Sequence, residues 1–374
     1  MQRNFTIALA VGLLCISLMP EALAQRLRGS RGRNNTVVAE PLRDDPNNIH
    51  KLYLGLMPVY SDMFVSNVTW GVGADAMIYP KTELGQKKYS VHLHGRTTYA
   101  PQTDLNRFVH RANISTDEEF GFNSLAWYTY VEAGGEYFFF DDQGVTDIYK
   151  LPVQRKKWDP QEWESTVTPD FDMEGKKRTL VGARFGLVGY RSAVNIGNVA
   201  VRDSIMIRGT LTQEDGSVLN NVGYDSVRGL AEALEVQDIA FSNVTVGAIY
   251  AGVSMRWIWN LAAEPEGHAV AILDNLITGY ADVIISPAAI AFSDILTFNG
   301  SYAVAGSSLN ENFQNLFGGR IGIDLAQNRS FGWGLNAEIG YRPGLSTAGF
   351  YMMGGLRFPV LGTDLDYSRE TILK

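Results

Sequence analysis

The stretch that decides the fold runs from Phe317 to Phe358 and reads FGGRIGIDLAQNRSFGWGLNAEIGYRPGLSTAGFYMMGGLRF. Apolar residues alternate with polar residues or glycine along three segments, which are separated at residues 327–331 and at Pro343-Gly344. A period of two places successive side chains on opposite faces of a strand. Each segment has roughly 10 to 12 residues, enough for a tilted strand to cross the hydrocarbon layer of a membrane. The stretch therefore predicts three consecutive membrane-crossing strands.

The same alternation recurs upstream and predicts an all-β chain that forms a transmembrane antiparallel β-barrel of about ten strands. We expect the strands at residues 51–59, 68–79, 88–99, 121–140, 178–192, 244–259, 269–284, 316–326, 332–343 and 347–360. An even number places both ends of the barrel in the periplasm. The connections 100–120, 193–243 and 285–315 then become long outer loops, and 80–87, 260–268 and 327–331 become short inner turns.

The segment 141–177 does not fit this scheme, because an inner turn should be short and this one is long and charged. Either the two flanking strands extend as a hairpin into the periplasm, or residues 138–153 hold a further pair of strands. The second alternative would give twelve strands, and a barrel of eight strands is the other count left open.

The ends of the chain are expected to lie outside the barrel. Residues 1–24 have the pattern of a cleaved export signal, with an apolar run over 7–18 and Ala22-Leu23-Ala24 before the cleavage position. Residues 25–50 begin with several arginines and are expected to form a flexible periplasmic tail. The barrel is expected over 51–360, and 361–374 is expected to be a second periplasmic tail.

Composition excludes several classes of function. The one cysteine, Cys15, lies in the expected signal, so a mature chain would have no disulfide, thiolate metal site or cysteine nucleophile. The net charge of −8 and the pI near 5.2 argue against nucleic acid as a partner. Charged residues make up 19% of the chain, fewer than is usual for a water-soluble domain. No apolar stretch after the expected signal is long and uninterrupted enough for a helix through a membrane.

Taken together, these features resemble the outer-membrane β-barrels of Gram-negative bacteria, in the general porin-like superclass, with no narrower family assigned. The resemblance implies export, a multi-pass outer-membrane location and contact with lipid. Aromatic residues at the ends of apolar faces, such as Trp257, Trp259 and Trp333, fit the aromatic belts of such barrels. A soluble all-β domain with one wet face would produce the same alternation and is the competing interpretation.

The inward face of the expected strands carries nearly balanced acids and bases. Its members are Asp75, His92, His94, Arg96, Glu132, Glu136, Arg184, Asp274, Asp282, Arg320, Asp324, Glu338, Arg342 and Arg357. The interior of a barrel of this size is filled by side chains, and an unpaired buried charge is costly. We therefore expect a polar network that plugs the lumen, with a narrow conduit as the alternative.

Two weaker hypotheses concern histidines. His92 and His94 share a face near Asp75, and two imidazoles with a carboxylate are a zinc ligand set, although no further ligand is identifiable. The omptin proteases resemble this chain in strand number and long outer loops, which implies a histidine at the rim. His110, near Asp104 and Asp117, is the weak catalytic candidate.

The sequence thus favours a non-enzymatic outer-membrane barrel that acts as a structural or partner-binding component of the cell envelope. It predicts no cofactor, and it predicts outer-membrane lipid and another envelope protein as partners. A narrow channel for small solutes is the first alternative, and a surface protease or lipase of the barrel type is the second.

Overall fold

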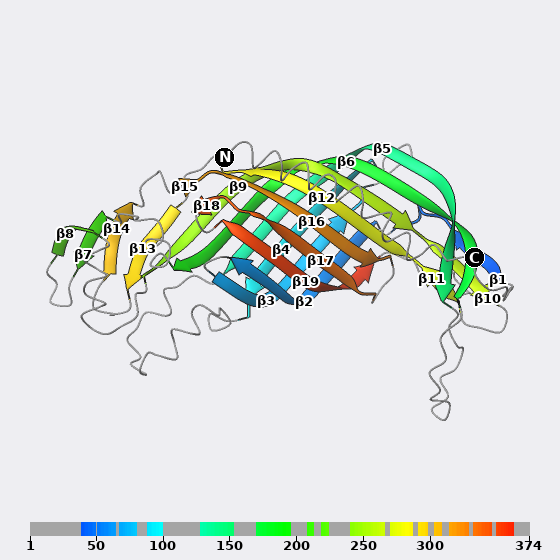
Figure 1. The fold of residues 1–374 in the computed structure, drawn as a ribbon, viewed down its shortest axis with the longest axis horizontal. Helices are drawn as coiled ribbons and strands as arrows, with labels where there is room; N and C mark the ends of the chain where they lie inside the picture. The colour runs from blue at the N-terminus through cyan, green and yellow to red at the C-terminus, as the bar shows by residue number, and fades with distance from the viewer. Residues whose placement is uncertain are drawn as a thin grey trace, which may run out of the picture.

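The computed structural model of the chain, drawn in Figure 1, is built from β-strands. It describes residues 39–49, 51–64, 67–80, 88–99, 128–152, 170–195, 208–212, 218–223, 240–265, 270–286, 291–297, 303–308, 314–328, 332–345 and 349–362. Within these ranges no helix is long and apolar enough to cross a membrane.

Ten strands form a closed antiparallel barrel (Figure 1). In order around the ring they are β2 (Leu52–Phe64), β3 (Asn67–Ile78), β4 (Tyr89–Thr98), β5 (Thr129–Pro152), β6 (Asp170–Asn195), β9 (Ala240–Trp259), β12 (Asn275–Ile285), β16 (Phe317–Gln327), β17 (Gly334–Tyr341) and β19 (Phe350–Gly362). The ring is closed by pairing of β19 with β2, where Leu356 lies opposite Val59. The predicted ten-stranded antiparallel barrel is confirmed, and the counts of eight and twelve are wrong.

The segment 141–177 is explained by a long hairpin. β5 and β6 stay paired from Thr129 opposite Arg191 to Pro152 opposite Asp170, well beyond the barrel wall. Register shifts between Phe138 and Phe140 and between Gln143 and Val145 interrupt the pairing without ending it. Of the two alternatives that the sequence left open, the extended hairpin is confirmed and the extra strand pair is wrong. We call residues 145–152 and 170–177 the extension hairpin.

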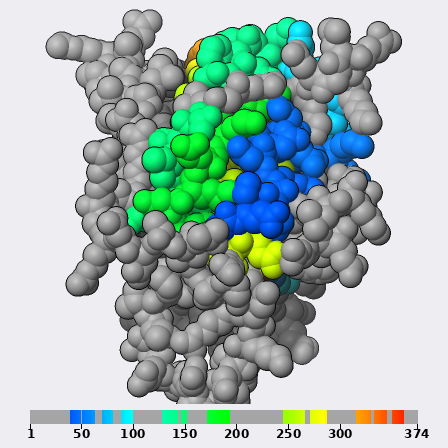
Figure 2. All heavy atoms as spheres, turned by 90° about the vertical axis from the view of Figure 1, so that its right-hand side faces the viewer, coloured from blue at the N-terminus to red at the C-terminus, as the bar shows by residue number. Residues whose placement is uncertain are grey.

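A small sheet lies beside the extension hairpin. It consists of β1 (Ala39–Asp44), β10 (Leu261–Pro265) and β11 (Ala271–Leu273), and we call it the end sheet. Figure 2 views this end of the molecule, where blue N-terminal residues adjoin green residues of β6 and yellow residues around β10 and β11. The backbone N–H of Lys176 donates to Asp44 Oδ1 at 2.8 Å and so joins the hairpin to β1.

The end sheet and the extension hairpin change three expectations from the sequence. Residues 39–44, within the segment expected to be a flexible tail, are a paired strand, and the expected inner turn 260–268 contains β10. Trp257 and Trp259, expected in an aromatic belt at the membrane surface, are 3% and 4% exposed. They pack with Leu151 and Phe171 of the extension hairpin and with Leu261 of the end sheet. The two tryptophans are therefore core residues of this extension.

At the opposite end of the barrel, further strands continue from β9. These are β13 (Ala291–Thr297), β14 (Ala303–Ser308), β7 (Arg208–Thr212) and β8 (Val218–Gly223), in that order across the sheet. They lie within the expected outer loops 193–243 and 285–315, so those connections contain strands of their own (left side of Figure 1). Near them, β15 (Gln314–Asn315) pairs with β18 (Gly344–Leu345).

The barrel wall has an apolar outer face. On β19, Tyr351 and Met353 are buried, whereas Met352 and Leu356 are about half exposed. Exposed large apolar side chains recur around the ring at Leu56, Val91, Leu93, Val131, Tyr137, Phe185, Leu187, Ile249, Val253, Ile339 and Phe358. The polar positions of the same strands point inward, as the alternation predicts.

Candidate functional site

The barrel interior is divided into layers along its axis. A central polar layer is bounded on one side by the aromatic and aliphatic cluster that contains Val188, Tyr190 and Val246. On the other side an apolar layer contains Phe138, Leu180 and Ile258, and it includes Ile49 from the segment before β2. Ile49 is 4% exposed. Side chains therefore fill much of the lumen toward the extension hairpin, where a second pocket of about 20 Å³ remains beside Ile49 and Tyr53.

The segment that contributes Ile49 is fixed by hydrogen bonds. Asn260 Nδ2 donates to the backbone oxygen of Asp45 at 2.9 Å and to that of Asn48 at 2.8 Å. Asn328 Nδ2 donates to the same Asn48 oxygen at 3.1 Å. Residues 45–49 are thus held in a fixed position at this end of the barrel.

Arg320 is the centre of the polar layer. From β16 its guanidinium contacts Glu132 on β5 at 2.6 Å, Asp282 on β12 at 2.8 Å and Glu338 on β17 at 3.3 Å. Arg184 on β6 lies 3.4 Å from Asp282 and stacks on the Tyr280 ring, with its guanidinium carbon 3.9 Å from the ring centroid. Since these residues come from different strands, the network joins opposite sides of the barrel.

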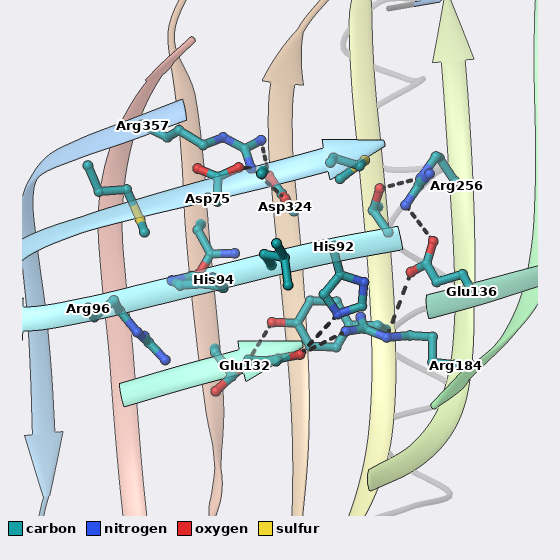
Figure 3. A pocket seen from close by; sticks show the side chains of 18 residues that line it. Asp75, His92, His94, Arg96, Glu132, Glu136, Arg184, Arg256, Asp324 and Arg357 are labelled. Carbon is teal, nitrogen blue, oxygen red and sulfur yellow. Dashed lines mark hydrogen bonds and ion pairs between the residues drawn. The ribbon is translucent and has the colours of Figure 1, made fainter. Parts of the chain in front are cut away.

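Three further arginines are paired around this centre. Arg256 donates to Glu136 at 2.6 Å, and Arg342 pairs with Asp62 at 2.8 Å. Arg357 pairs with Asp324 at 2.6 Å and with Asp75 at 3.0 Å, as Figure 3 shows. Direct contact with a carboxylate compensates the burial of each of these guanidinium groups.

Tyrosine hydroxyls fill hydrogen-bonding positions that the arginines leave. Tyr280 donates to Glu338 at 2.7 Å, Tyr351 donates to the same carboxylate, and Tyr130 donates to Glu132 at 2.6 Å. Glycines make room for these rings. Gly322 lies directly opposite Tyr280, and a Cβ at Gly322 would overlap its ring.

Almost all of the residues predicted from the sequence lie in this interior. The structure brings together Asp75, His92, His94, Arg96, Glu132, Glu136, Arg184, Asp282, Arg320, Asp324, Glu338, Arg342 and Arg357. Asp274 is also buried, but it lies at the junction of β11 and β12, where its backbone oxygen accepts from Asn328. His110 lies outside the described residues.

Sequence reasoning missed Asp62 and Arg256. Arg256 lies on the same face of its segment as Tyr250 and Ser254, so the period of two could have identified it. Asp62 lies beyond the expected end of its strand, after a register shift between Met57 and Tyr60 that moves the buried face to even-numbered residues. No signal in the sequence marks that shift apart from Pro58.

The three weak metal candidates have separate surroundings. Asp75 is bound by Arg357, whereas His92 Nε2 lies 2.7 Å from the Tyr250 hydroxyl and 3.2 Å from Glu132. His94 stands edge-on to Tyr130. Among the described residues, no three His, Cys, Asp or Glu side chains are grouped as a metal site.

A small cavity remains within the polar layer. Its volume is about 70 Å³, and its lining includes Asp75, His94, Arg96, Glu132 and Arg184 (Figure 3). This volume holds a few water molecules or one small ion. This cavity is therefore too small for a sugar or a peptide.

Comparisons with known proteins give no family. No protein-family model matches the chain, and no curated protein matches its sequence. Among solved structures, a channel described as "TodX deltaS2S3 mutant monoaromatic hydrocarbon channel" aligns over 88% of this chain and 96% of that chain. The sequence identity is 10% and the TM-score 0.16, a similarity that carries no argument about function.

Proposed function

We propose that the chain is an outer-membrane β-barrel and that lipid covers its outer face. The support is the ring of exposed apolar side chains, which includes Phe185 and Leu187 at 60% and 61% exposure. Water-soluble monomers rarely expose contiguous apolar surface on this scale, whereas a membrane barrel needs it. The closed ring also leaves no unpaired barrel edge in the hydrocarbon.

Within that membrane, the barrel acts as a closed, non-enzymatic component of the envelope that is structural or binds a partner. One observation carries this proposal: paired charges fill the central layer, and an apolar layer containing Ile49 closes one side of it. A conducting pore needs a continuous aqueous path, and the central cavity of about 70 Å³ is much smaller than one.

The extension hairpin and the end sheet form the surface on which we place the partner, another protein of the envelope. They share a buried core around Leu151 and Trp259, so they are built as a rigid unit rather than as a loop. The strand β6 presents the exposed charged side chains Asp172, Glu174 and Lys176 there. A mixture of charges suits a polar protein contact better than a lipid contact.

Site-specific photo-crosslinking in cells tests the partner role. A photoreactive residue at Glu174, on the exposed face of the extension hairpin, should give one discrete protein adduct. The matched position is Leu187, which faces outward on the barrel part of the same strand and should give no such adduct. Equal absence of adducts at Glu174, Asp172 and Lys176 would contradict the partner role.

A narrow channel for small solutes is the second candidate, and the polar lining of the central cavity is what favours it. Single-channel recording in planar bilayers separates the two functions. The unaltered, closed barrel should show no conductance steps. The variant Ile49→Gly should show occasional conductance steps, because it opens the apolar layer. Regular steps from the unaltered chain would favour the channel.

A further inference from the structure

The inner face of β4 carries polar side chains that lack the partners found elsewhere in the lumen. Arg96 is 3% exposed, and its Nε and Nη1 atoms are buried without a hydrogen-bond partner. Its guanidinium carbon lies 4.1 Å from the centroid of the Tyr130 ring, a contact that leaves the edge of the group free to donate. His94, two residues earlier on the same face, has a buried Nε2 that also lacks a partner.

Both side chains line the central cavity. Figure 3 shows His94 and Arg96 projecting from one strand with no dashed line to either, whereas Arg256, Arg357 and Glu132 are all joined to neighbours. Burying a guanidinium without a carboxylate in direct contact is costly, and the charges of Asp62 and Glu338 act on Arg96 without forming an ion pair with it. An acceptor beside the guanidinium would lower this cost. The cavity lies next to both side chains.

The carboxylates that line the same cavity each form an ion pair with an arginine. Arg357 binds both Asp75 and Asp324, and Arg256 binds Glu136. Glu132 and Glu338 are held by Arg320. A negative ion beside Arg96 would therefore meet carboxylates that are each in direct contact with an arginine. One carboxylate oxygen, Asp75 Oδ1, is buried without a hydrogen-bond partner, and we place the ion away from it, at Arg96.

We propose that a small monovalent anion, of the size of chloride or formate, binds in the central cavity between Arg96 and His94. Arg96 supplies the charge and N–H donors, and His94 supplies a donor when Nε2 carries a proton. The volume of about 70 Å³ suits an ion of this size. This inference concerns the lumen and does not depend on the partner function proposed above.

The direct test is crystallography of the full chain in bromide. Crystals grown in detergent with low-millimolar bromide should show an anomalous peak within hydrogen-bond distance of the Arg96 guanidinium. A cavity that contains only water at every bromide concentration would overturn the proposal.

Anion-dependent unfolding provides a second test in solution. Chloride should raise the unfolding temperature relative to gluconate, a much bulkier monovalent anion, at equal ionic strength, because a ligand of the folded state stabilises it. Formate in place of chloride tells whether a carboxylate or a halide is preferred. Arg96→Met should weaken the apparent affinity by about tenfold or more, and His94→Gln should weaken it less.

The control variant is Arg191→Gln, which removes an exposed arginine from β6 and should leave the chloride response unchanged. An equal chloride response in Arg96→Met and the unaltered chain would also overturn the proposal. If Arg96→Met does not fold, the anomalous peak in the bromide crystals and the chloride response of His94→Gln still test the proposal.

Discussion

At the scale of single residues, the interior is organised by arginines that are shared between carboxylates. Arg320 is 3% exposed and touches Glu132, Asp282 and Glu338 at once. A buried ion pair adds little stability relative to an apolar pair of the same shape, but breaking one side of it is expensive. The network therefore determines the arrangement of the strands more than it adds to the stability of the fold.

Replacing Arg320 with methionine should destabilise the barrel strongly. Glu132, Asp282 and Glu338 would remain buried but would lose the cation that they share. The free energy of unfolding should fall by on the order of 3–5 kcal/mol. Urea unfolding of the detergent-solubilised protein, followed by tryptophan fluorescence, measures the change. Arg191→Met, at an exposed position on β6, is the control and should change stability little. Equal midpoints for the two variants would contradict the shared-arginine network.

Gly322→Ala tests the close approach of a tyrosine to the neighbouring strand. The new Cβ would overlap the Tyr280 ring and displace its hydroxyl from Glu338, for roughly 1–3 kcal/mol. Gly354→Ala is the matched control, because a Cβ there meets open space. The unfolding midpoint should fall for the first variant only, and equal midpoints would show that Tyr280 can move aside freely.

At the scale of elements, the extension hairpin and the end sheet form a second core attached to the barrel. Leu151 and Leu261 are essentially inaccessible there, and Trp257 and Trp259 link this core to β9. Pairing along β5 and β6 extends from the barrel into the hairpin, past two register shifts. The second core therefore depends on the barrel for its position, but its own side chains hold it together.

Leu151→Ala should loosen this second core and leave the barrel closed. Removing a buried leucine costs roughly 2–5 kcal/mol, here confined to the extension. Limited proteolysis should cut the extension hairpin faster, while the barrel keeps the gel mobility of its folded, unheated form. Ile148→Ala is the control, since Ile148 is 51% exposed on the same strand. Faster cleavage in both variants alike would refute a packed core.

How much of this the sequence predicts depends on the length of each element. Long strands such as β16 and β19 show the period of two over many residues, so their faces can be predicted. The end sheet cannot be found in this way, because residues 261–265 read LAAEP and are buried on both faces, which removes the alternation. The inward orientation of Asp62 could not be predicted for a different reason. A register shift in β2 exchanges the buried and exposed faces of the strand before this residue.

At the scale of the whole molecule, the two faces of the wall have opposite chemistry. The inside carries paired charges, and the outside carries residues such as Phe185 and Leu187. Prediction from sequence works at this scale because most barrel strands repeat the same pattern. An exception such as β12, which is buried over six consecutive residues, therefore does not change the fold class. The number of ten barrel strands could be predicted because the same alternation recurs along the chain.

Leu187→Arg tests the proposed lipid contact. An arginine facing hydrocarbon costs about 2–4 kcal/mol near the middle of the bilayer, whereas on a water-exposed surface it would cost almost nothing. The yield of folded protein on insertion into liposomes should fall. Thr146→Arg, at an exposed position on the extension hairpin, is the comparison and should insert normally. Normal insertion of both would argue for a water-soluble barrel.

The pairing of β1 with β10 also limits the order in which the molecule can assemble. Ala39 lies opposite Pro265, and the strand that closes the ring, β19, must meet β2 across an even longer separation along the chain. Contacts so distant in sequence form slowly, because a large loop must be closed before they become favourable. The N-terminal strand therefore waits unpaired until β10 is in place, and during that interval its free edge needs protection from other chains.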